Sequence, residues 1–374
     1  MVIGVLKEPL FETRVSLLPD AAAALVKKGI KVFVENGAGE KAFSYNDDYT
    51  KIGAEIKSAA EIIESADVIL SINVQAGEPV KNKVLIGVYQ PLYHKELMSA
   101  WAGAGITCFS LDMLPRTTRA QSMDVLSSQA NISGYKAVLL AADKYSRYFP
   151  MFMTAAGTIA PAKVLILGAG VAGLQAIATA RRLGAVVEVF DTRPAVKEEV
   201  ISLGGKFIEV EGAADASKAG GYAVEQSEEF QQKQKEKIAE SIAKADVVIT
   251  TAQIPGKKAP VLVTKEMIAK MRRGSIIVDL AAATGGNTDH TKNNETVMVD
   301  GVAIIGNSAL PSTMPSDASK LYGKNVLNFL HLITTKEGEL FLNFEDDLVK
   351  GSCITHNGAV VHEKVQITGT DDKK

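Results

Sequence analysis

The chain has 374 residues, about twice the size of a typical domain, so two domains are expected. Apolar residues make up 47% and charged residues 22%, a globular balance, and the formal net charge of −2 provides no basic surface for nucleic acid. The two cysteines, Cys108 and Cys353, form neither a disulfide framework nor a metal-ligand spacing, and no apolar run is long enough for direct membrane insertion, so we expect no bound metal and a reducing compartment.

Short runs of β-branched residues alternate with helical stretches along the first part of the chain. The predicted strands there are Val2–Leu6, Lys31–Glu35, Val68–Ile72 and Val84–Tyr89, and the predicted helices are Asp20–Lys28, Tyr49–Ile52 and Ala59–Ser65. This alternation predicts a parallel sheet with helices on both faces. Because the chain starts with a strand and not with a basic segment before an apolar run, we expect no signal peptide.

The same pattern starts again near residue 163. A predicted helix at Val171–Leu183 lies among predicted strands at Lys163–Leu167, Val186–Phe190, Lys206–Val210, Asp246–Thr250 and Ser275–Asp279. Arg119–Phe149 and Ala318–Leu332 predict two long helices that bridge the halves. We therefore expect an α/β protein with two Rossmann-like parallel-sheet domains, residues 1–127 plus 309–374 and residues 128–308, linked by long bridging helices.

Residues 211–241 form a long connection that is rich in Glu, Gln, Lys, Ala and Gly, where such folds usually need only a few residues. Part of it, Glu225–Ala243, is predicted to be helical. The rest has two interpretations. It is either a solvated surface insertion or a mobile lid whose Gly221 and Tyr222 close on a ligand.

A Gly-x-Gly-x-x-Gly motif at residues 168–173 lies between a predicted strand and a predicted helix. Gly168 permits a tight turn, Gly170 lets the backbone approach a pyrophosphate, and Gly173 lets helix and strand pack closely. The helix then offers free N–H groups and its positive dipole end to the phosphates. In this context the motif predicts a dinucleotide site, and a glycine turn without a ligand is the alternative.

The next predicted strand ends at Asp191, 18 residues beyond Gly173. An acid at this position hydrogen-bonds the adenosine ribose hydroxyls and repels a 2′-phosphate, which favours NAD(H). Arg193, two residues further on, favours NADP(H) instead. Because Asp191 occupies the strand end itself, we expect NAD(H).

Two loops, residues 250–256 and 279–287, follow later strands at the sheet edge where ligands lie. We expect both loops, including Gln253, to line the nicotinamide half of the nucleotide, although ordinary strand exits would look similar. Residues 281–284 carry no ionisable group, and none of the five histidines lies in a strand-end cluster with a carboxylate. A dehydrogenase of alcohols or amino acids needs an acid/base group at such a site, and none is evident.

Polar residues are densest between residues 114 and 129. If this segment is helical, Gln121, Asp124 and Ser128 share one face. A capped helix start with solvated polar groups is the alternative. The run Arg119–Tyr135, which begins Arg-Ala-Gln-Ser-Met-Asp, closely resembles the NAD(H)-binding component of proton-translocating nicotinamide nucleotide transhydrogenase.

That resemblance extends over nearly the whole chain, through Met153–Thr158, Val171–Ala180 and Ile254–Lys257. The related alanine dehydrogenases share part of the pattern. They place a His after the fourth strand of their first domain, where residues 88–92 here are Val-Tyr-Gln-Pro-Leu, and an Asp where this chain has Ala283. Arg14 resembles their substrate arginine, and without the other groups we expect it to serve structure.

The resemblance implies a role for each candidate site residue. It places Arg116, Gln121, Asp124 and Ser127 at the nicotinamide half, with Gln121 orienting the ring and its ribose. It assigns the rest of the nucleotide to Gly168, Gly170, Val171, Gly173, Asp191, Thr192 and Arg193, and to Gly221 and Tyr222 on the mobile loop.

The resemblance also implies a reaction. NADH bound here as a substrate passes a hydride to NADP⁺ on a separate NADP(H)-binding component, and a membrane component couples this step to proton translocation. Transfer between two nicotinamides needs no general acid or base, only rings held about 3–3.5 Å apart.

The expected assembly is a homodimer, cytoplasmic and peripheral on the inner face of the membrane (the matrix side in a mitochondrion). The chain resembles either the separate subunit or the same region of a longer one. Two other functions remain open: an alanine-type amino-acid dehydrogenase and a non-catalytic NADH-binding module.

Overall fold

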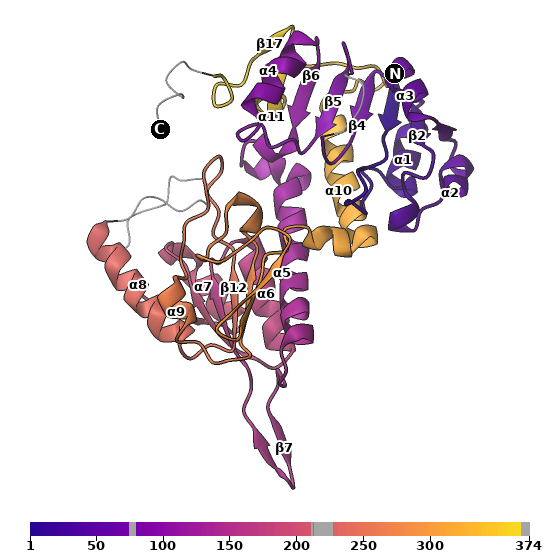
Figure 1. Cartoon of the computed structure of the whole chain (residues 1–374). Helices are drawn as coiled ribbons and strands as arrows, with labels where there is room; N and C mark the ends of the chain where they lie inside the picture. The colour runs from indigo at the N-terminus through magenta and orange to yellow at the C-terminus, as the bar shows by residue number, and fades with distance from the viewer. Residues whose placement is uncertain (75–79, 211, 213–226, 368–374) are drawn as a thin grey trace. The chain divides into compact units, whose positions relative to one another are not determined.

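The computed structural model describes residues 1–74, 80–210, 212 and 227–367. The chain splits into two compact units, Met1–Gln129 with Ser312–Lys374, and Ala130–Pro311 (Figure 1). It leaves the first unit within helix α5 (Val125–Lys144) and returns within the 3₁₀ helix η6 (Leu310–Thr313). The lid residues expected from the sequence, Gly221 and Tyr222, lie outside the described residues.

The first unit is built on a sheet whose described strands run in the order β17-β16-β6-β5-β4-β1-β2-β3. Strands β1 to β6 are parallel, whereas β16 and β17 form an antiparallel edge. Strands β4 and β5 are buried along their whole length, as expected for parallel strands covered on both faces. The strands are β1 (Val2–Val5), β2 (Lys31–Glu35), β3 (Glu55–Lys57), β4 (Val68–Leu70), β5 (Val84–Gly87), β6 (Thr107–Ser110), β16 (Cys353–His356) and β17 (Ala359–Val360).

Helices cover both faces of this sheet. One core contains Ile3 and Val5 of β1 and the inner side of α10, where Phe329 meets Phe109 with ring centroids 5.4 Å apart. A second core, on the other face, contains Ile62 of α3 and Met98 of α4. The helices are α1 (Pro19–Val26), α2 (Asn46–Lys51), α3 (Ala59–Ser65), α4 (Lys95–Gly103), α10 (Pro315–Leu330) and α11 (Asp347–Ser352), with 3₁₀ turns η1 (Glu40–Ala42), η2 (Leu111–Met113) and η3 (Thr118–Met123).

The second unit has a doubly wound sheet in the order β11-β10-β9-β12-β13-β15-β14, parallel except for edge strand β14. The chain order reverses between β9 and β12, and ligands of such sheets bind at the carboxyl ends of the strands at this switch point. The strands are β9 (Lys163–Leu167), β10 (Val186–Phe190), β11 (Lys206–Phe207), β12 (Val247–Thr250), β13 (Ile276–Asp279), β14 (Thr296–Val299) and β15 (Val302–Ile305).

Alternate side chains of β9 reach different helices. Val164 and Ile166 pack in the core that contains α5, α6 and α7, while Leu165 and Leu167 pack in the core that contains α8 and α9. A separate hairpin of β7 (Phe152–Thr154) and β8 (Gly157–Ile159) projects from this unit (Figure 1). The helices are α6 (Val171–Arg182), α7 (Lys197–Ser202), α8 (Glu228–Ile242) and α9 (Lys265–Ile268), with 3₁₀ turns η4 (Pro194–Val196) and η5 (Ala282–Thr284).

The predicted α/β architecture is confirmed, but one predicted helix is wrong at its start. Helix α5 begins at Val125 rather than at Arg119, because Asp124 has extended backbone (φ −74°, ψ 90°) and the residues before it form η3. The helical face expected for Gln121, Asp124 and Ser128 therefore does not exist. The hairpin β7–β8 was not predicted, whereas α8 falls inside the helix expected at 225–243.

Candidate functional site

The glycine turn of the second unit joins β9 to α6 at the switch point. Gly168 has a φ of +105°, and a Cβ on Gly173 would lie 1.9 Å from the carbonyl oxygen of Gly168, so both positions require glycine. A Cβ on Gly170 would meet no atom within 4 Å. Gly170 also caps α6 without a side-chain hydrogen bond, and Val171 in the first turn is exposed. These features fit a pyrophosphate beside Gly170 and the first N–H groups of α6.

Asp191 follows β10 and lies against this turn. Its Oδ2 accepts a hydrogen bond from the N–H of Ala169 at 2.7 Å. The side chain of Arg193 forms a bidentate pair with the same carboxylate, Nε to Oδ1 at 2.8 Å and Nη2 to Oδ2 at 2.7 Å. This pairing raises the pKa of Arg193. Thr192 between them is half-buried. The two residues that favour NAD(H) and NADP(H) respectively are therefore partners in one ion pair.

Two polar side chains order the loops after β12 and β13. The buried carboxylate of Asp279 accepts hydrogen bonds from the N–H groups of Ala281 (2.9 Å) and Asn287 (2.6 Å) and from Oγ1 of Thr291 (2.6 Å). The Asn287 amide in turn exchanges hydrogen bonds with the backbone of Ala252. Gln253 is exposed and donates to the carbonyl of Leu280 at 3.0 Å. Sequence reasoning assigned no role to Asp279, although it ends a strand just as Asp191 follows one.

The polar segment expected at the nicotinamide half lies in the first unit. Arg116 and Gln121 are exposed, and Gln121 sits on η3. Asp124 caps α5, because its carboxylate accepts hydrogen bonds from the N–H (2.9 Å) and the hydroxyl (2.6 Å) of Ser127. Asp124 and Ser127 are therefore in contact, while Gln121 projects from a different local structure.

Residues of α10 and α11 hold η3 in place. The carbonyl of Ser122 accepts hydrogen bonds from the side-chain amides of Asn325 (2.8 Å) and Asn328 (2.9 Å). Arg119 pairs with Asp346 through two 2.7 Å hydrogen bonds and also contacts Asp347. The backbone that carries Gln121 is thus fixed by contacts from two helices that come much later in the chain.

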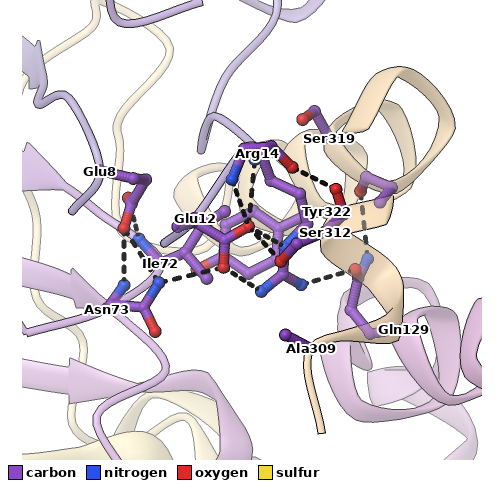
Figure 2. A network of polar contacts seen from close by, with 12 residues as sticks. Glu8, Glu12, Arg14, Ile72, Asn73, Gln129, Ala309, Ser312, Ser319 and Tyr322 are labelled. Atoms are coloured by element: carbon purple, nitrogen blue, oxygen red, sulfur yellow. Dashed lines mark hydrogen bonds and ion pairs between the residues drawn. The ribbon is translucent and has the colours of Figure 1, made fainter. Parts of the chain in front are cut away.

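A buried polar network surrounds Arg14 in the first unit (Figure 2). Glu12 accepts hydrogen bonds from Arg14 Nε at 2.8 Å and Nη2 at 2.6 Å, and Gln129 accepts one from Nη1 at 2.8 Å. Ser312 donates to Glu12 at 2.6 Å. Burial opposes the ionisation of Glu12, but the hydrogen bonds and charge of Arg14 lower its pKa to about 2. Each nitrogen of the Arg14 guanidinium therefore has a partner from this chain.

Glu8 lies beside this pair. It accepts hydrogen bonds from the N–H groups of Ile72 (2.5 Å) and Asn73 (3.1 Å) and from the Asn73 side-chain amide (3.1 Å). Burial nevertheless raises the pKa of Glu8 to about 7. The sequence indicated Arg14 but neither glutamate, because no motif marks Glu8 or Glu12 as its partners.

Among the residues that the structure describes, no helix is both long and apolar enough to cross a membrane. The same residues contain no group of three or more His, Cys, Asp or Glu side chains that could hold a metal ion.

Known proteins match both units. The family models for alanine dehydrogenase/PNT match residues 4–133 with the N-terminal domain and 137–363 with the C-terminal domain. The first segment of the NAD(P) transhydrogenase alpha subunit of Rhodospirillum rubrum, a separate chain there, is 46% identical over 364 residues, 94% of this chain and 95% of the relative. A solved transhydrogenase structure from Sinorhizobium meliloti has a TM-score of 0.88 at 46% identity, covering 96% of this chain and 100% of its own. Alanine dehydrogenase of Bacillus subtilis is 27% identical over 98% of this chain and 94% of the relative.

The chain therefore belongs to the alanine dehydrogenase/PNT family of two-domain α/β proteins. The higher identities place it with the alpha subunits of NAD(P) transhydrogenase, as the first segment of that subunit. The resemblance seen in residues 119–135 is thus confirmed at the level of the family.

Proposed function

We propose that the chain binds NAD(H) as a substrate and presents it for direct hydride transfer to NADP⁺ held by another component of the transhydrogenase. The observation that carries this proposal is the fit of a dinucleotide to the turn at residues 168–173. Gly168 and Gly173 leave no room for a Cβ, Gly170 faces open space, and Asp191 lies within hydrogen-bond distance of Ala169. These residues would hold the pyrophosphate and the adenosine ribose.

The nicotinamide supplies the hydride, and the residues of this chain bind and orient it. Gln121, exposed on the anchored turn η3, would orient the ring and its ribose, while Arg116, Asp124 and Ser127 complete that end of the site. Gln253 would line the same half of the nucleotide, and Gly221 and Tyr222 would close over it. A direct transfer gains its rate from positioning, so it needs no proton donor or acceptor.

The network around Arg14 supports this assignment over an alanine-type dehydrogenase. An oxidised amino acid would need a cation for its carboxylate and a base for its amino or hydroxyl proton. Arg14 already holds the Glu12 carboxylate and Gln129. The loop at residues 281–284 consists of three alanines and a threonine. The chain thus offers a nucleotide site without the groups that a small substrate requires.

The proposed assembly is a homodimer that meets an NADP(H)-binding component and a membrane component, on the inner face of the membrane. The hairpin β7–β8 and the residue before it expose apolar side chains at Met151, Phe152 and Met153, which are 57%, 42% and 74% exposed. Such side chains are typical of a surface that a second copy covers. Sedimentation equilibrium should give a dimer, and Phe152→Ser with Met153→Ser should shift it towards monomer.

Two assays on the isolated chain test the proposed function. NADH fluorescence should titrate to saturation, and NADPH should bind at least about tenfold more weakly. NAD⁺ with L-alanine or another amino acid should give no NADH. Robust amino-acid oxidation by this chain would overturn the proposal, as would an equal affinity for NADH and NADPH.

A further inference from the structure

The carboxylate of Asp191 is saturated by hydrogen bonds from the chain itself. A carboxylate offers about four acceptor positions on its two oxygens. Asp191 receives four hydrogen bonds: from the N–H of Ala169, from the N–H of Arg193, and from Nε and Nη2 of Arg193. Its side chain is 6% exposed, so water has little access to it.

A ribose diol bound at Asp191 donates two hydrogen bonds and needs two of those positions. The two backbone N–H groups belong to the turn and to the residues after β10, which the sheet holds in place. Gly168, next to Ala169, donates its N–H to Phe190 at 2.8 Å, and this bond ties the turn to the end of β10. The two side-chain bonds of Arg193 depend only on rotamers of a side chain that is 17% exposed. The guanidinium is therefore the partner that can leave.

We propose that Arg193 is a displaceable latch on Asp191, and that the adenosine ribose binds by exchanging its two hydroxyls for the guanidinium. This inference rests on the proposed function, in which Asp191 holds the ribose of NAD(H). The affinity for the nucleotide is then reduced by the fraction of molecules in which the latch is closed, as for any site whose competent state is partly populated.

The latch also determines nucleotide specificity. While it is closed, Asp191 and Arg193 form a neutral pair, and the repulsion that Asp191 exerts on a 2′-phosphate is weakened. Once Arg193 has moved, its guanidinium can pair with that phosphate. Arg193 thus reduces the discrimination against NADP(H) that Asp191 alone would give.

The test compares two ligands of equal charge, ADP and 2′,3′-dideoxy-ADP, by displacement of NADH fluorescence. Only ADP carries the hydroxyls that compete with the latch. In Arg193→Leu the ratio of the dideoxy-ADP Kd to the ADP Kd should rise about tenfold above the wild-type ratio, the equivalent of one charge-assisted bidentate contact. The ratio of the NADPH Kd to the NADH Kd should rise as well. Arg193→Lys, which keeps the charge but not the fork, should give an intermediate ligand ratio.

A matched control removes another Arg–Asp pair from the same unit. Arg272 donates to Asp246 at 2.9 Å ahead of β12, at the opposite end of the strand from the glycine turn. Arg272→Leu changes the net charge equally and should leave the ligand ratio unchanged. Thermal denaturation of each variant shows whether the second unit is still folded.

An unchanged or smaller ratio in folded Arg193→Leu and Arg193→Lys would overturn the latch, because the guanidinium would then not compete with the ribose. Asp191→Ala separates this failure from that of the proposed function. It should bring the ratio close to one. If it leaves the ratio at the wild-type value, the ribose does not bind Asp191, and both the ribose assignment and the latch are wrong.

Discussion

Glu8 and Glu12 are both buried in one network, yet the structure gives them opposite ionisation behaviour. Burial raises the pKa of Glu8 to about 7, although three N–H donors face it. Burial disfavours the charge of Glu12 too, but the guanidinium of Arg14 lowers its pKa to about 2. A neighbouring cation thus outweighs desolvation at one carboxylate, and neutral donors do not outweigh it at the other.

The first prediction concerns stability against pH. The pKa of Glu8 rises from 4.5 to about 7 on folding, so its contribution to stability is fully present below pH 4.5 and is lost as the pH rises through 7. The loss amounts to about 3 kcal/mol of unfolding free energy. Urea unfolding of the wild type and Glu8→Gln from pH 4.5 to 8 measures it. The difference between the two proteins should change across this window, and parallel curves would refute the assignment.

The second prediction concerns the buried pair. Arg14→Leu leaves the Glu12 carboxylate without its cation and should reduce the free energy of unfolding at pH 7 by about 3–5 kcal/mol. The double variant Glu12→Leu with Arg14→Leu should recover much of that loss, because no buried charge remains. Denaturant unfolding of the two single variants and the double variant forms the cycle. Strictly additive effects would show that the two side chains do not interact.

The third prediction concerns Gln121. Gln121→Asn keeps the amide but shortens the side chain by one methylene, so the ring would be held less well. Single-turnover hydride transfer to the NADP(H)-binding component should slow by about tenfold or more, while the Kd of NADH changes little. Ser122→Ala, which keeps the carbonyl bound by Asn325 and Asn328, serves as the control. A large loss of affinity at an unchanged rate would contradict an orienting role.

At the scale of elements, the junction of β9 and α6 separates the needs of folding from those of binding. In Gly173→Ala the new Cβ would lie 1.9 Å from the Gly168 carbonyl oxygen, so strand and helix must move apart. In Gly170→Ala the methyl group enters open space. The fourth prediction is that Gly173→Ala lowers the Tm strongly, by about 5 °C or more, and weakens NADH binding. Gly170→Ala should keep a near-native Tm and still weaken NADH at least about tenfold. Wild-type affinity in Gly170→Ala would remove this turn from the site.

Strands and helices of regular pattern could be predicted from sequence, and β2, α3, β9 and β10 match their predicted bounds. Residues 118–124 could not. Their composition suits a helix, but Asp124 caps α5 through Ser127, and distant Asn325 and Asn328 fix the backbone before it. The amide pair at Ser122 and the glutamates around Arg14 arise from tertiary contacts that no local pattern contains. The glycine turn and Asp191 were predictable because their spacing follows from the βαβ geometry itself.

At the scale of the whole molecule, the two units have similar sheets but different polar groups at the carboxyl ends of their strands. In the first unit the network of Glu8, Glu12 and Arg14 follows β1, and its groups bind one another. In the second unit the turn after β9 faces open space at Gly170. The repeat of the strand–helix pattern predicted two related sheets, whereas only side-chain geometry distinguishes a self-satisfied edge from a binding edge.

The central claim is that the hydride passes directly from NADH on this chain to NADP⁺ on its partner component. NADH deuterated at both C4 positions, mixed with this chain and the NADP(H)-binding component of a related transhydrogenase, tests it by mass spectrometry of the NADPH formed. The account predicts NADPH that carries one deuterium per molecule, with none lost to solvent, and no product when this chain is omitted. Unlabelled NADPH, or no NADPH from the complete mixture, would contradict it.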